Sequence, residues 1–422
     1  MFLLIDVHSM YCSAETIHRP DLRHKDAKIV VMSNGDGIAV AVNKAAKQAG
    51  IRKFEPLFKQ KQLIKANGVK VFSSNYTLYS KVSDNLVQCL IRSDIFEDIQ
   101  QYSIDEVFAS LPAMNFSYGE FVDIARSIRR TVWQHTRLPV GVGIGQTFTL
   151  SKVASWIGKN AEGYRGICVI PRGAEDEFLR QMPVREVWNI GRATAELLQK
   201  QNISTAYDLS RISREEARRL VGIQLERVVM ELRGEQVYSM QSFPDASNRH
   251  EVTSSISLTQ KAETAQDLHQ ALSDRISVAA EKLRRLGFLA SSMTIFARTN
   301  HHYGKYIANS RTVDFINPVD DTRVFLKALT DNFDKLYEDN AAFYKIGCRL
   351  QGLVGKEFQQ GDLFAPTYSS DLMKVMDSLN ERFGQQTLSL AAQKVDANAK
   401  MTRNHLSPNY LSQWKEIPRL KC

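Results

Sequence analysis

The sequence predicts an α+β protein of several domains, and three observations support this fold class. The chain has 422 residues, more than a single hydrophobic core usually organises. Residues 1–165 alternate segments typical of strands with segments typical of helices, an α/β or α+β pattern. Residues 174–240 change to short helical segments separated by turns, and residues 251–355 return to a mixed strand and helix pattern.

The first region is expected to open with a strand over residues 1–12 that leads into a helix at Ser13–Thr16. Further strands are expected at Lys28–Met32, Val107–Leu111 and Pro139–Gly145, and helices at Val42–Ala49, Ser80–Leu90, Phe121–His135 and Leu150–Lys159. Gly50 is typical of a residue that ends a helix. The alternate glycines of the strand Pro139–Gly145 allow another backbone to approach it closely.

Two strands and two long helices are expected in the region 251–355. The strands are Glu251–Leu258 and Ala290–Phe296, and the helices are Ala265–Leu286 and Arg323–Leu336. Thr264 is a typical N-cap for the first of these helices. Residues 356–422 are polar and weakly periodic, and we expect them to form a tail.

The net charge of +9 is unevenly distributed. Between Lys44 and Lys70 the chain carries eight Lys or Arg residues and one acidic residue, Glu55. A basic lobe of this kind suits a polyanionic substrate, although a solvated helix face explains the same charges. The five cysteines are scattered without zinc spacing, which fits a reducing compartment. No segment approaches the ~20 apolar residues that cross a membrane, and no leader is evident, so we expect a soluble cytoplasmic protein.

Three carboxylates form the most informative pattern in the sequence. Asp6 lies in the first apolar strand, and Asp105 and Glu106 lie in the segment Ser103–Phe108. Two such strands side by side bring the three groups to one place, where like charges require a cation. Mg²⁺ prefers such oxygen ligands, and two ions ~3.5–4 Å apart clamp the oxygens of a phosphoryl transfer. The alternative is that the aspartates are ordinary turn residues at strand ends.

Tyr11 and several lysines are candidate nucleotide-binding residues. The Tyr11 ring, five residues after Asp6, is suited to pack against a nucleotide sugar and to exclude a 2′-hydroxyl group, unless it is simply a core residue. Lys44, Lys47 and Lys159 are candidates for binding a triphosphate, although single lysines are often only surface residues.

Two short segments are candidates for contacts with macromolecules. Asn189, Ile190 and Gly191 resemble a helix–hairpin–helix turn, which presents backbone N–H groups to a DNA phosphate. Gln360–Phe364 offers a polar anchor at Gln360 and apolar groups at Leu363 and Phe364, as in a linear motif that docks in a partner's pocket. A chance Leu-Phe pair in a linker is the alternative.

Taken together, these motifs resemble those of the Y-family translesion DNA polymerases, and among them the UmuC-type catalytic subunits of bacterial DNA polymerase V. The resemblance is carried by Asp6, Tyr11, Ser103–Glu106, Val140–Ile144, Lys152 and Lys159. Further agreeing segments are Phe58–Lys61, Phe72–Tyr76, Leu232–Glu235, Ala279–Arg284 and Leu406–Pro408. The resemblance covers essentially the whole chain.

The resemblance implies a right-handed polymerase fold with an additional C-terminal tail. The implied domains are a palm at 1–18 and 77–168, fingers at 19–76, a helical thumb at 169–240, an α/β little finger at 243–355 and a partner-binding tail at 356–422. The implied activity is error-prone synthesis across damaged template in the SOS response of a bacterium. The substrates are then primer-template DNA and deoxynucleoside triphosphates.

The resemblance also assigns roles to residues of this chain. Asp6, Asp105, Glu106 and the carbonyl of Val7 would hold two Mg²⁺ ions, and Tyr11 would be the steric gate for the sugar. Lys47 and Lys159 occupy the basic triphosphate positions of the family. Gln360–Phe364 matches a sliding-clamp motif, and the tail would meet a processed UmuD-type dimer and the RecA filament.

The sequence departs from the family pattern at four positions, and this leaves two other functions open. Val42 replaces an arginine, Met10 a phenylalanine, His8 an asparagine and Asn189 a glycine. Because the carboxylates remain, we expect an active polymerase. A catalytically impaired DNA-binding or regulatory homologue is the main alternative. A nucleotide cyclase is a further alternative, against which the thumb turn and the clamp-type motif argue.

Overall fold

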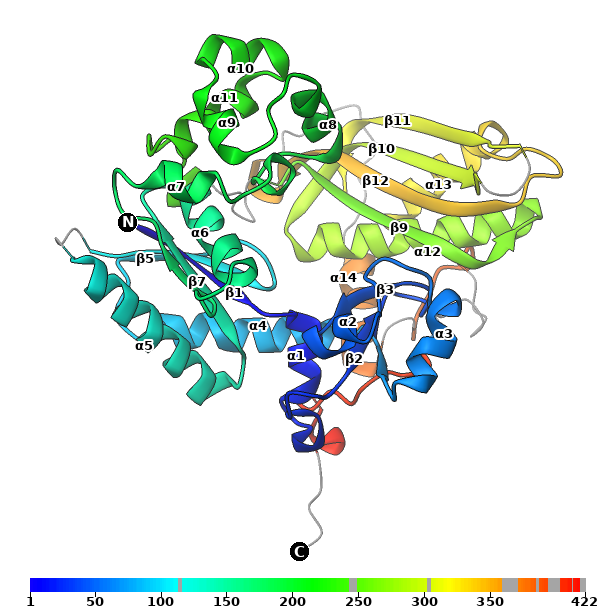
Figure 1. Ribbon diagram of the computed structural model, residues 1–422. Helices are drawn as coiled ribbons and strands as arrows, with labels where there is room; N and C mark the ends of the chain where they lie inside the picture. Colours follow the sequence, from blue (N-terminus) through cyan, green and yellow to red (C-terminus); the bar gives the residue numbers. More distant parts are fainter. Residues whose placement is uncertain are drawn as a thin grey trace, which may run out of the picture. The chain divides into compact units, whose positions relative to one another are not determined.

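The computed structural model describes residues 1–112, 116–242, 249–301, 305–358, 371–384, 387–393, 403–411 and 413–417. The chain forms two compact units (Figure 1). The first unit is Met1–Phe243 with Thr402–Cys422, and the second unit is Pro244–Met401. In the described part of the chain, no helix is long and apolar enough to cross a membrane.

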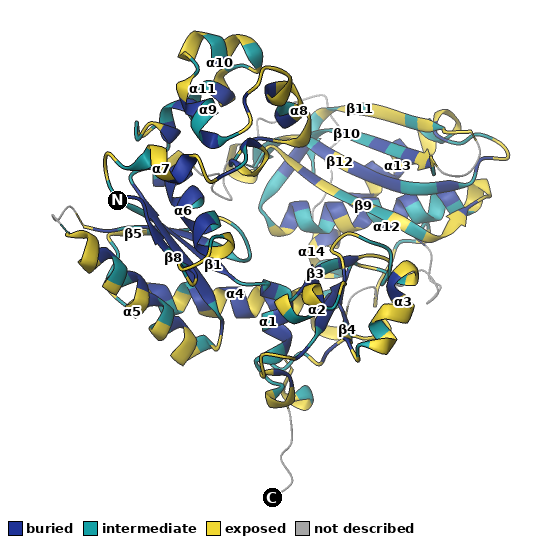
Figure 2. Ribbon diagram, in the orientation of Figure 1, coloured by how far each residue is buried: buried dark blue, intermediate teal, exposed yellow. Residues whose placement is uncertain are grey.

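A five-stranded sheet forms the centre of the first unit. Its strands are β1 (Phe2–Val7), β5 (Asp98–Gln101), β6 (Glu106–Ser110), β7 (Val140–Gly145) and β8 (Ile167–Val169), in the order β5-β6-β1-β7-β8. β1 pairs antiparallel with both β6 and β7, which confirms the predicted pairing of the carboxylate-bearing strands. Because β1 is central, its five residues after Phe2 are all buried, as the dark blue ribbon of Figure 2 shows.

Alternate residues of β1 face opposite sides of this sheet. Leu3, Ile5 and Val7 pack in the core beneath α4 (Tyr76–Ile91) and α5 (Tyr118–Thr136). Leu4 faces the other side, where it packs with Phe108 of β6 and Phe148 of α6 (Phe148–Asn160). By this alternation Asp6 also faces the side that is covered by α6.

The helix α6 packs directly against β7 because that strand carries glycine at alternate positions. A Cβ atom at Gly143 would collide with the backbone of Ser151 and Ser155, and one at Gly145 would lie 2.7 Å from the backbone of Leu150. The close approach predicted from the alternate glycines is therefore present, and its partner is α6.

A second sheet has the order β3-β2-β4, with strands β2 (Ile29–Met32), β3 (Ala39–Val42) and β4 (Lys70–Ser73). It lies among the short helices α1 (Met10–Thr16), η1 (Pro20–Leu22), α2 (Lys44–Gln48) and α3 (Leu57–Ala66). The first strand ends at Val7 rather than at residue 12, because Ser9 adopts a left-handed backbone (φ 49°) and begins α1. The segment expected to be one helix, Val42–Ala49, is divided between the end of β3 and α2.

Residues 174–240 form the predicted series of short helices. They are α7 (Glu175–Leu179), η2 (Val184–Glu186), α8 (Arg192–Lys200), α9 (Ala206–Arg211), α10 (Arg214–Leu220), α11 (Ile223–Leu232) and η3 (Met240–Ser242), beyond β8. The buried carboxylate of Glu231 joins them to α6, because it accepts a hydrogen bond from the Thr149 amide (3.0 Å) and others from Val237 and Tyr238.

The second unit contains a four-stranded antiparallel sheet of order β11-β10-β12-β9. Its strands are β9 (Glu251–Ala262), β10 (Phe288–Thr299), β11 (Ala308–Val319) and β12 (Phe343–Gly355). Two helices, α12 (Ala265–Arg285) and α13 (Thr322–Asn332), share its core, and η5 (Phe333–Lys335) and η6 (Lys356–Phe358) are short turns. Thr264 caps α12 as predicted, because its side chain accepts a hydrogen bond from the Asp267 amide.

The C-terminal residues contain more structure than the expected tail. In the second unit, α14 (Asp371–Phe383) buries Met373 and forms an ion pair between Asp377 and Arg284 of α12 (2.6 Å). In the first unit, residues 403–411 return to α1 and α4, and η8 (Trp414–Glu416) follows. The segment Gln360–Phe364 lies outside the described residues. The finer division into palm, fingers, thumb and little finger remains a prediction.

Candidate active site

The backbone brings the three acidic residues together at one edge of the first sheet. Asp6 is the direct partner of Glu106 in the pairing of β1 with β6. The next hydrogen bond runs from the Val7 amide to the Asp105 carbonyl oxygen (2.9 Å), so Asp105 extends the same pairing. The turn between β5 and β6 is closed by the Tyr102 and Ser103 amides, which both donate to the Glu106 carbonyl oxygen.

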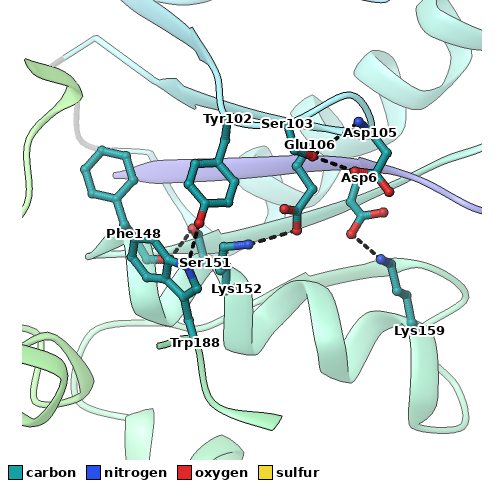
Figure 3. Close-up of polar contacts among 10 residues, drawn as sticks. All are labelled: Asp6, Tyr102, Ser103, Asp105, Glu106, Phe148, Ser151, Lys152, Lys159 and Trp188. Atoms are coloured by element: carbon teal, nitrogen blue, oxygen red, sulfur yellow. Dashed lines mark hydrogen bonds and ion pairs between the residues drawn. The ribbon is translucent and has the colours of Figure 1, made fainter. Parts of the chain in front are cut away.

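Two lysines of α6 are paired with two of these carboxylates (Figure 3). Lys152 forms an ion pair with Glu106 (2.8 Å), and Lys159 forms one with Asp6. The two lysines are seven residues apart, close to two helical turns, so both extend from the same face of α6. Sequence reasoning gave Lys159 a triphosphate role and used Lys152 only in the resemblance, so it missed both pairings.

Asp105 differs from the other two acidic residues because its nearest polar partner is a neutral side chain. The Ser103 hydroxyl group donates a hydrogen bond to its carboxylate (2.5 Å) and accepts one from its amide (3.3 Å). In the part of the chain that the structure describes, no three His, Cys, Asp or Glu side chains are already gathered as a metal-binding group. The three acidic residues are therefore neighbours along the paired backbones, and their side chains contact lysine or serine.

The electrostatic environment of Asp6 favours an additional cation. The pKa of Asp6 is raised to about 6, chiefly by burial and also by Glu106 and Asp105, although Lys159 opposes the change. Nearby, burial lowers the pKa of His8 to about 4, with contributions from Lys159 and Arg129, so this residue is a neutral imidazole at pH 7. One lysine at Asp6 thus compensates only part of the cost of a buried carboxylate beside two others.

Aromatic rings surround the ammonium group of Lys152. It lies 4.7 Å from the ring centre of Tyr102, 5.5 Å from Trp188 and 5.6 Å from Phe108. The Trp188 indole N–H donates a hydrogen bond to the Tyr102 hydroxyl group (3.0 Å), which fixes two of the rings. Cation–π attraction and the ion pair with Glu106 together hold Lys152 in this position.

Tyr11 lies in the first turn of α1 and is partly buried. Its ring stacks on Tyr79 of α4 (centroids 4.7 Å apart, 15° between planes) and meets the edge of Tyr76 (5.6 Å). Burial raises the pKa of Tyr11 to about 12, with smaller contributions from Tyr76 and Asp105.

The remaining predicted residues are distributed over other elements. Lys44 and Lys47 are exposed on α2. Ile190 is buried, and Gly191 is the N-cap of α8 with no side-chain hydrogen bond. Asn189 adopts a left-handed backbone (φ 66°), a conformation that glycine favours and that asparagine tolerates better than most residues. Gln360, Leu363 and Phe364 lie outside the described residues.

Family models match four parts of the chain. Two of them describe the impB/mucB/samB family (residues 5–156) and its C-terminal domain (residues 249–363). The others describe the IMS family HHH motif (residues 172–203) and a domain of unknown function (residues 370–420).

Curated relatives and solved structures are similar over most of their length. Protein MucB of Salmonella typhimurium is 35% identical, with 99% of each chain covered. Protein UmuC of Salmonella typhimurium strain LT2 is 35% identical, with 100% of each chain covered. A chimera of the Y-family DNA polymerases Dbh and Dpo4 has a TM-score of 0.68 at 17% identity, covering 84% of this chain and 99% of the chimera.

Proposed function

The chain belongs to the impB/mucB/samB family of Y-family DNA polymerases, and from this membership we propose how its residues carry out the reaction. It is an error-prone translesion DNA polymerase of the UmuC and MucB type, with a role in SOS mutagenesis. The observation that carries our proposal for the site is the register of Asp6 opposite Glu106, with Asp105 next in the same pairing.

Asp6, Asp105, Glu106 and the Val7 carbonyl oxygen would hold the metal ions on which such polymerases depend. The donor set suits magnesium, because all of its atoms are oxygens. The raised pKa of Asp6 also fits, because a bound cation would offset the cost of burying this carboxylate and its repulsion by the two others. Two bound Mg²⁺ ions would neutralise charge on the triphosphate and orient the attacking and leaving oxygens.

The two lysines have different roles in this proposal. Lys159 is the more exposed, with 30% of its side chain accessible against 13% for Lys152. Lys159 would bind the triphosphate as a point charge, and Lys44 and Lys47 of α2 would add to the same positive field. Lys152 stays within its aromatic cage and positions Glu106.

Tyr11 would act as the steric gate that excludes ribonucleotides. Its ring is supported by Tyr79 behind it and by Tyr76 at its edge, so it cannot move away freely when a sugar approaches. A ring at that place meets a 2′-hydroxyl group, which only a ribonucleotide carries.

The macromolecular partners are proposed from the family and from sequence motifs. The turn Asn189–Gly191 would contact the phosphates of primer-template DNA through the N-terminus of α8. Gln360, Leu363 and Phe364 would bind the sliding clamp. The C-terminal region would meet a processed UmuD-type dimer and the RecA filament, and the protein would act in the bacterial cytoplasm.

Extension of a primed template that carries an abasic site tests the proposed site. With Mg²⁺ and the partner subunits present, Asp105→Asn should nearly abolish nucleotide addition, while DNA affinity measured by fluorescence anisotropy stays within about twofold. Asp123→Asn is the matched control, because Asp123 is an exposed aspartate on α5. Near-normal extension by Asp105→Asn would contradict the site, and an inactive natural protein would favour the impaired homologue.

A further inference from the structure

A buried chain of hydrogen bonds links the C-terminal segment 403–411 to the ring that supports Tyr11. We propose that Ser407 is a positioning residue for Tyr11, acting through Glu15 and Tyr79, so that the C-terminal segment contributes to sugar selection. This inference rests on the proposed role of Tyr11 as the steric gate. Ser407 lies 396 positions after Tyr11 in the sequence, and among the described residues its side chain forms hydrogen bonds with Glu15 and Asn75 rather than with Tyr11 or the three acidic residues of the candidate site.

Glu15 of α1 is the centre of the chain of contacts. Its Oε1 atom accepts a hydrogen bond from the Tyr79 hydroxyl group (2.6 Å) and another from the Ser407 hydroxyl group (3.0 Å). All three residues are buried, with exposed fractions of 1% for Glu15, 0% for Tyr79 and 6% for Ser407. Because both hydroxyl groups donate to the same buried oxygen, the position of Tyr79 depends on that of Ser407.

Tyr79 transmits this arrangement to the gate because it has a second contact on its ring face. The ring is stacked on Tyr11 at 4.7 Å and nearly parallel to it. The hydroxyl group of Tyr79 thus contacts Glu15, while the face of the same rigid side chain contacts Tyr11. A shift of Glu15 moves the surface on which Tyr11 rests.

Asn75 independently joins Ser407 to α4, the helix that carries Tyr79. Its side-chain amide donates hydrogen bonds to the Ser407 carbonyl oxygen (2.9 Å) and hydroxyl oxygen (3.2 Å). Its amide oxygen caps α4 by accepting from the Leu78 amide (3.2 Å). The C-terminal segment thus contributes to the start of the helix that carries Tyr76 and Tyr79.

The rest of the segment is held in place by backbone contacts. Ser73 of β4 and His405 form two hydrogen bonds with each other. The Ser73 amide donates to the His405 carbonyl oxygen (2.9 Å), and the His405 amide donates to the Ser73 hydroxyl group (3.0 Å). The Asn404 amide donates to Asp36 (2.8 Å). In Figure 1 this segment, coloured red, runs beside α1 and β2. Ser407 is therefore presented to Glu15 by a docked segment.

Removing the Ser407 hydroxyl group should weaken the support of Tyr11 without removing any group near the reacting atoms. Glu15 would then keep only Tyr79 as a donor, because its Oε2 atom has no hydrogen-bond partner among the described residues. Loss of one buried hydrogen bond changes an equilibrium by roughly three- to tenfold. We therefore expect Ser407→Ala to raise the ratio of ribonucleotide to deoxynucleotide incorporation by about that factor.

The experiment compares the kcat/KM values for a ribonucleotide and the matching deoxynucleotide in the full chain with its partners. Ser407→Ala and Tyr79→Phe should both raise the ratio, while deoxynucleotide insertion changes less than twofold. Asn404→Ala is the matched control, since the Asn404 side chain is exposed and only its backbone makes the contact described above. In a Tyr11→Ala background, Ser407→Ala should add nothing, because the group it positions is absent.

The outcomes separate this inference from the proposal on which it rests. If Tyr11→Ala leaves ribonucleotide discrimination unchanged, the steric-gate assignment fails and the inference fails with it. If Tyr11→Ala admits ribonucleotides and neither Ser407→Ala nor Tyr79→Phe alters the ratio, only the inference is overturned. Should Ser407→Ala fail to fold, Tyr79→Phe decides alone, because it keeps the stacked ring and removes only the hydroxyl group that reaches Glu15.

Discussion

Asp6 and Glu106 lie directly opposite each other on neighbouring antiparallel strands, and each is paired with a lysine from the same helix. Like charges at opposed positions of a sheet destabilise it. The lysines of α6 compensate this repulsion in the protein alone, and cations would do so during the reaction. The same negative charge can thus be balanced by the lysines or by bound cations.

Lys159→Ala should raise the KM for the incoming deoxynucleotide about tenfold or more and leave primer-template affinity within about twofold. The reason is that the variant loses a charge-assisted contact to the triphosphate, which contributes ~1.5–3 kcal/mol. Steady-state insertion kinetics on an undamaged template measure the effect. Lys81→Ala is the control, because Lys81 is exposed on α4 in a pair with Asp84. An unchanged KM would contradict the role of Lys159 in binding the nucleotide.

Lys152→Met should destabilise the folded protein by about 2 kcal/mol, because it leaves Glu106 without its cation and removes the cation–π contacts of the aromatic cage. The free energy of unfolding in urea measures this. The double variant Lys152→Met/Glu106→Gln should recover about half of the loss, because the uncompensated charge is gone. Lys81→Met, in an exposed pair, should cost less than ~0.5 kcal/mol. If the single and double variants lose the same free energy of unfolding, the effect of Lys152→Met comes from packing and not from the uncompensated charge of Glu106.

Glu15→Gln should make the protein less sensitive to pH between about 4.5 and 7. Burial raises the pKa of Glu15 from 4.5 to about 7, although Tyr79, Ser407 and Arg19 act in the opposite direction. The folded state therefore binds this proton more tightly than the unfolded state. The resulting stabilisation is complete below about pH 4.5 and is lost as the pH rises through about 7.

The amide that Glu15→Gln introduces does not titrate, so the difference in stability between variant and parent should grow by roughly 2–3 kcal/mol from about pH 4.5 to about pH 8. The free energy of unfolding in urea, measured at several pH values, gives this difference. Parallel pH profiles of the two proteins would show that Glu15 has an ordinary pKa.

Replacement of Leu363 and Phe364 with alanine should remove the gain in extension that the sliding clamp provides. Buried apolar anchors carry ~2 kcal/mol or more of a small interface, and a clamp acts by raising the local concentration of the polymerase on DNA. Extension on a short primer-template without clamp should barely change, which serves as the control. A double variant that still responds fully to the clamp would show that these residues are only part of a linker.

Sequence reasoning predicted the strand pairing beneath the candidate site because its strands are short, apolar and marked by carboxylates. The pairing of Asp6 with Glu106 followed from that pattern, and the capping of α12 by Thr264 followed from a local signal. The helix α3 was not predicted as an element, because its lysine-rich sequence was interpreted as a basic lobe, with a solvated helix face only as the alternative. Each of these predictions, whether correct or missed, relied on a pattern that spans only a few residues of the sequence.

Contacts between distant segments were beyond such reasoning. The pairing of Lys152 with Glu106 joins residues 46 positions apart, and that of Asn75 with Ser407 joins residues 332 apart. A single serine in a polar segment carries no periodic signal that predicts burial. The docking of residues 403–411 depends on the shape and hydrogen-bonding groups of a surface that exists only after the first unit folds.

Gly143 sets the distance between the sheet and the helix α6, and therefore the distance between the two lysines and their carboxylates. Because the α6 backbone rests on this residue, even one added methyl group at Gly143 would act as a spacer and displace the whole helix from the sheet. Both ammonium groups would then recede from Asp6 and Glu106 at the same time, whatever their side-chain conformations. A residue without a side chain thus sets how far two of the longest side chains extend toward their partners.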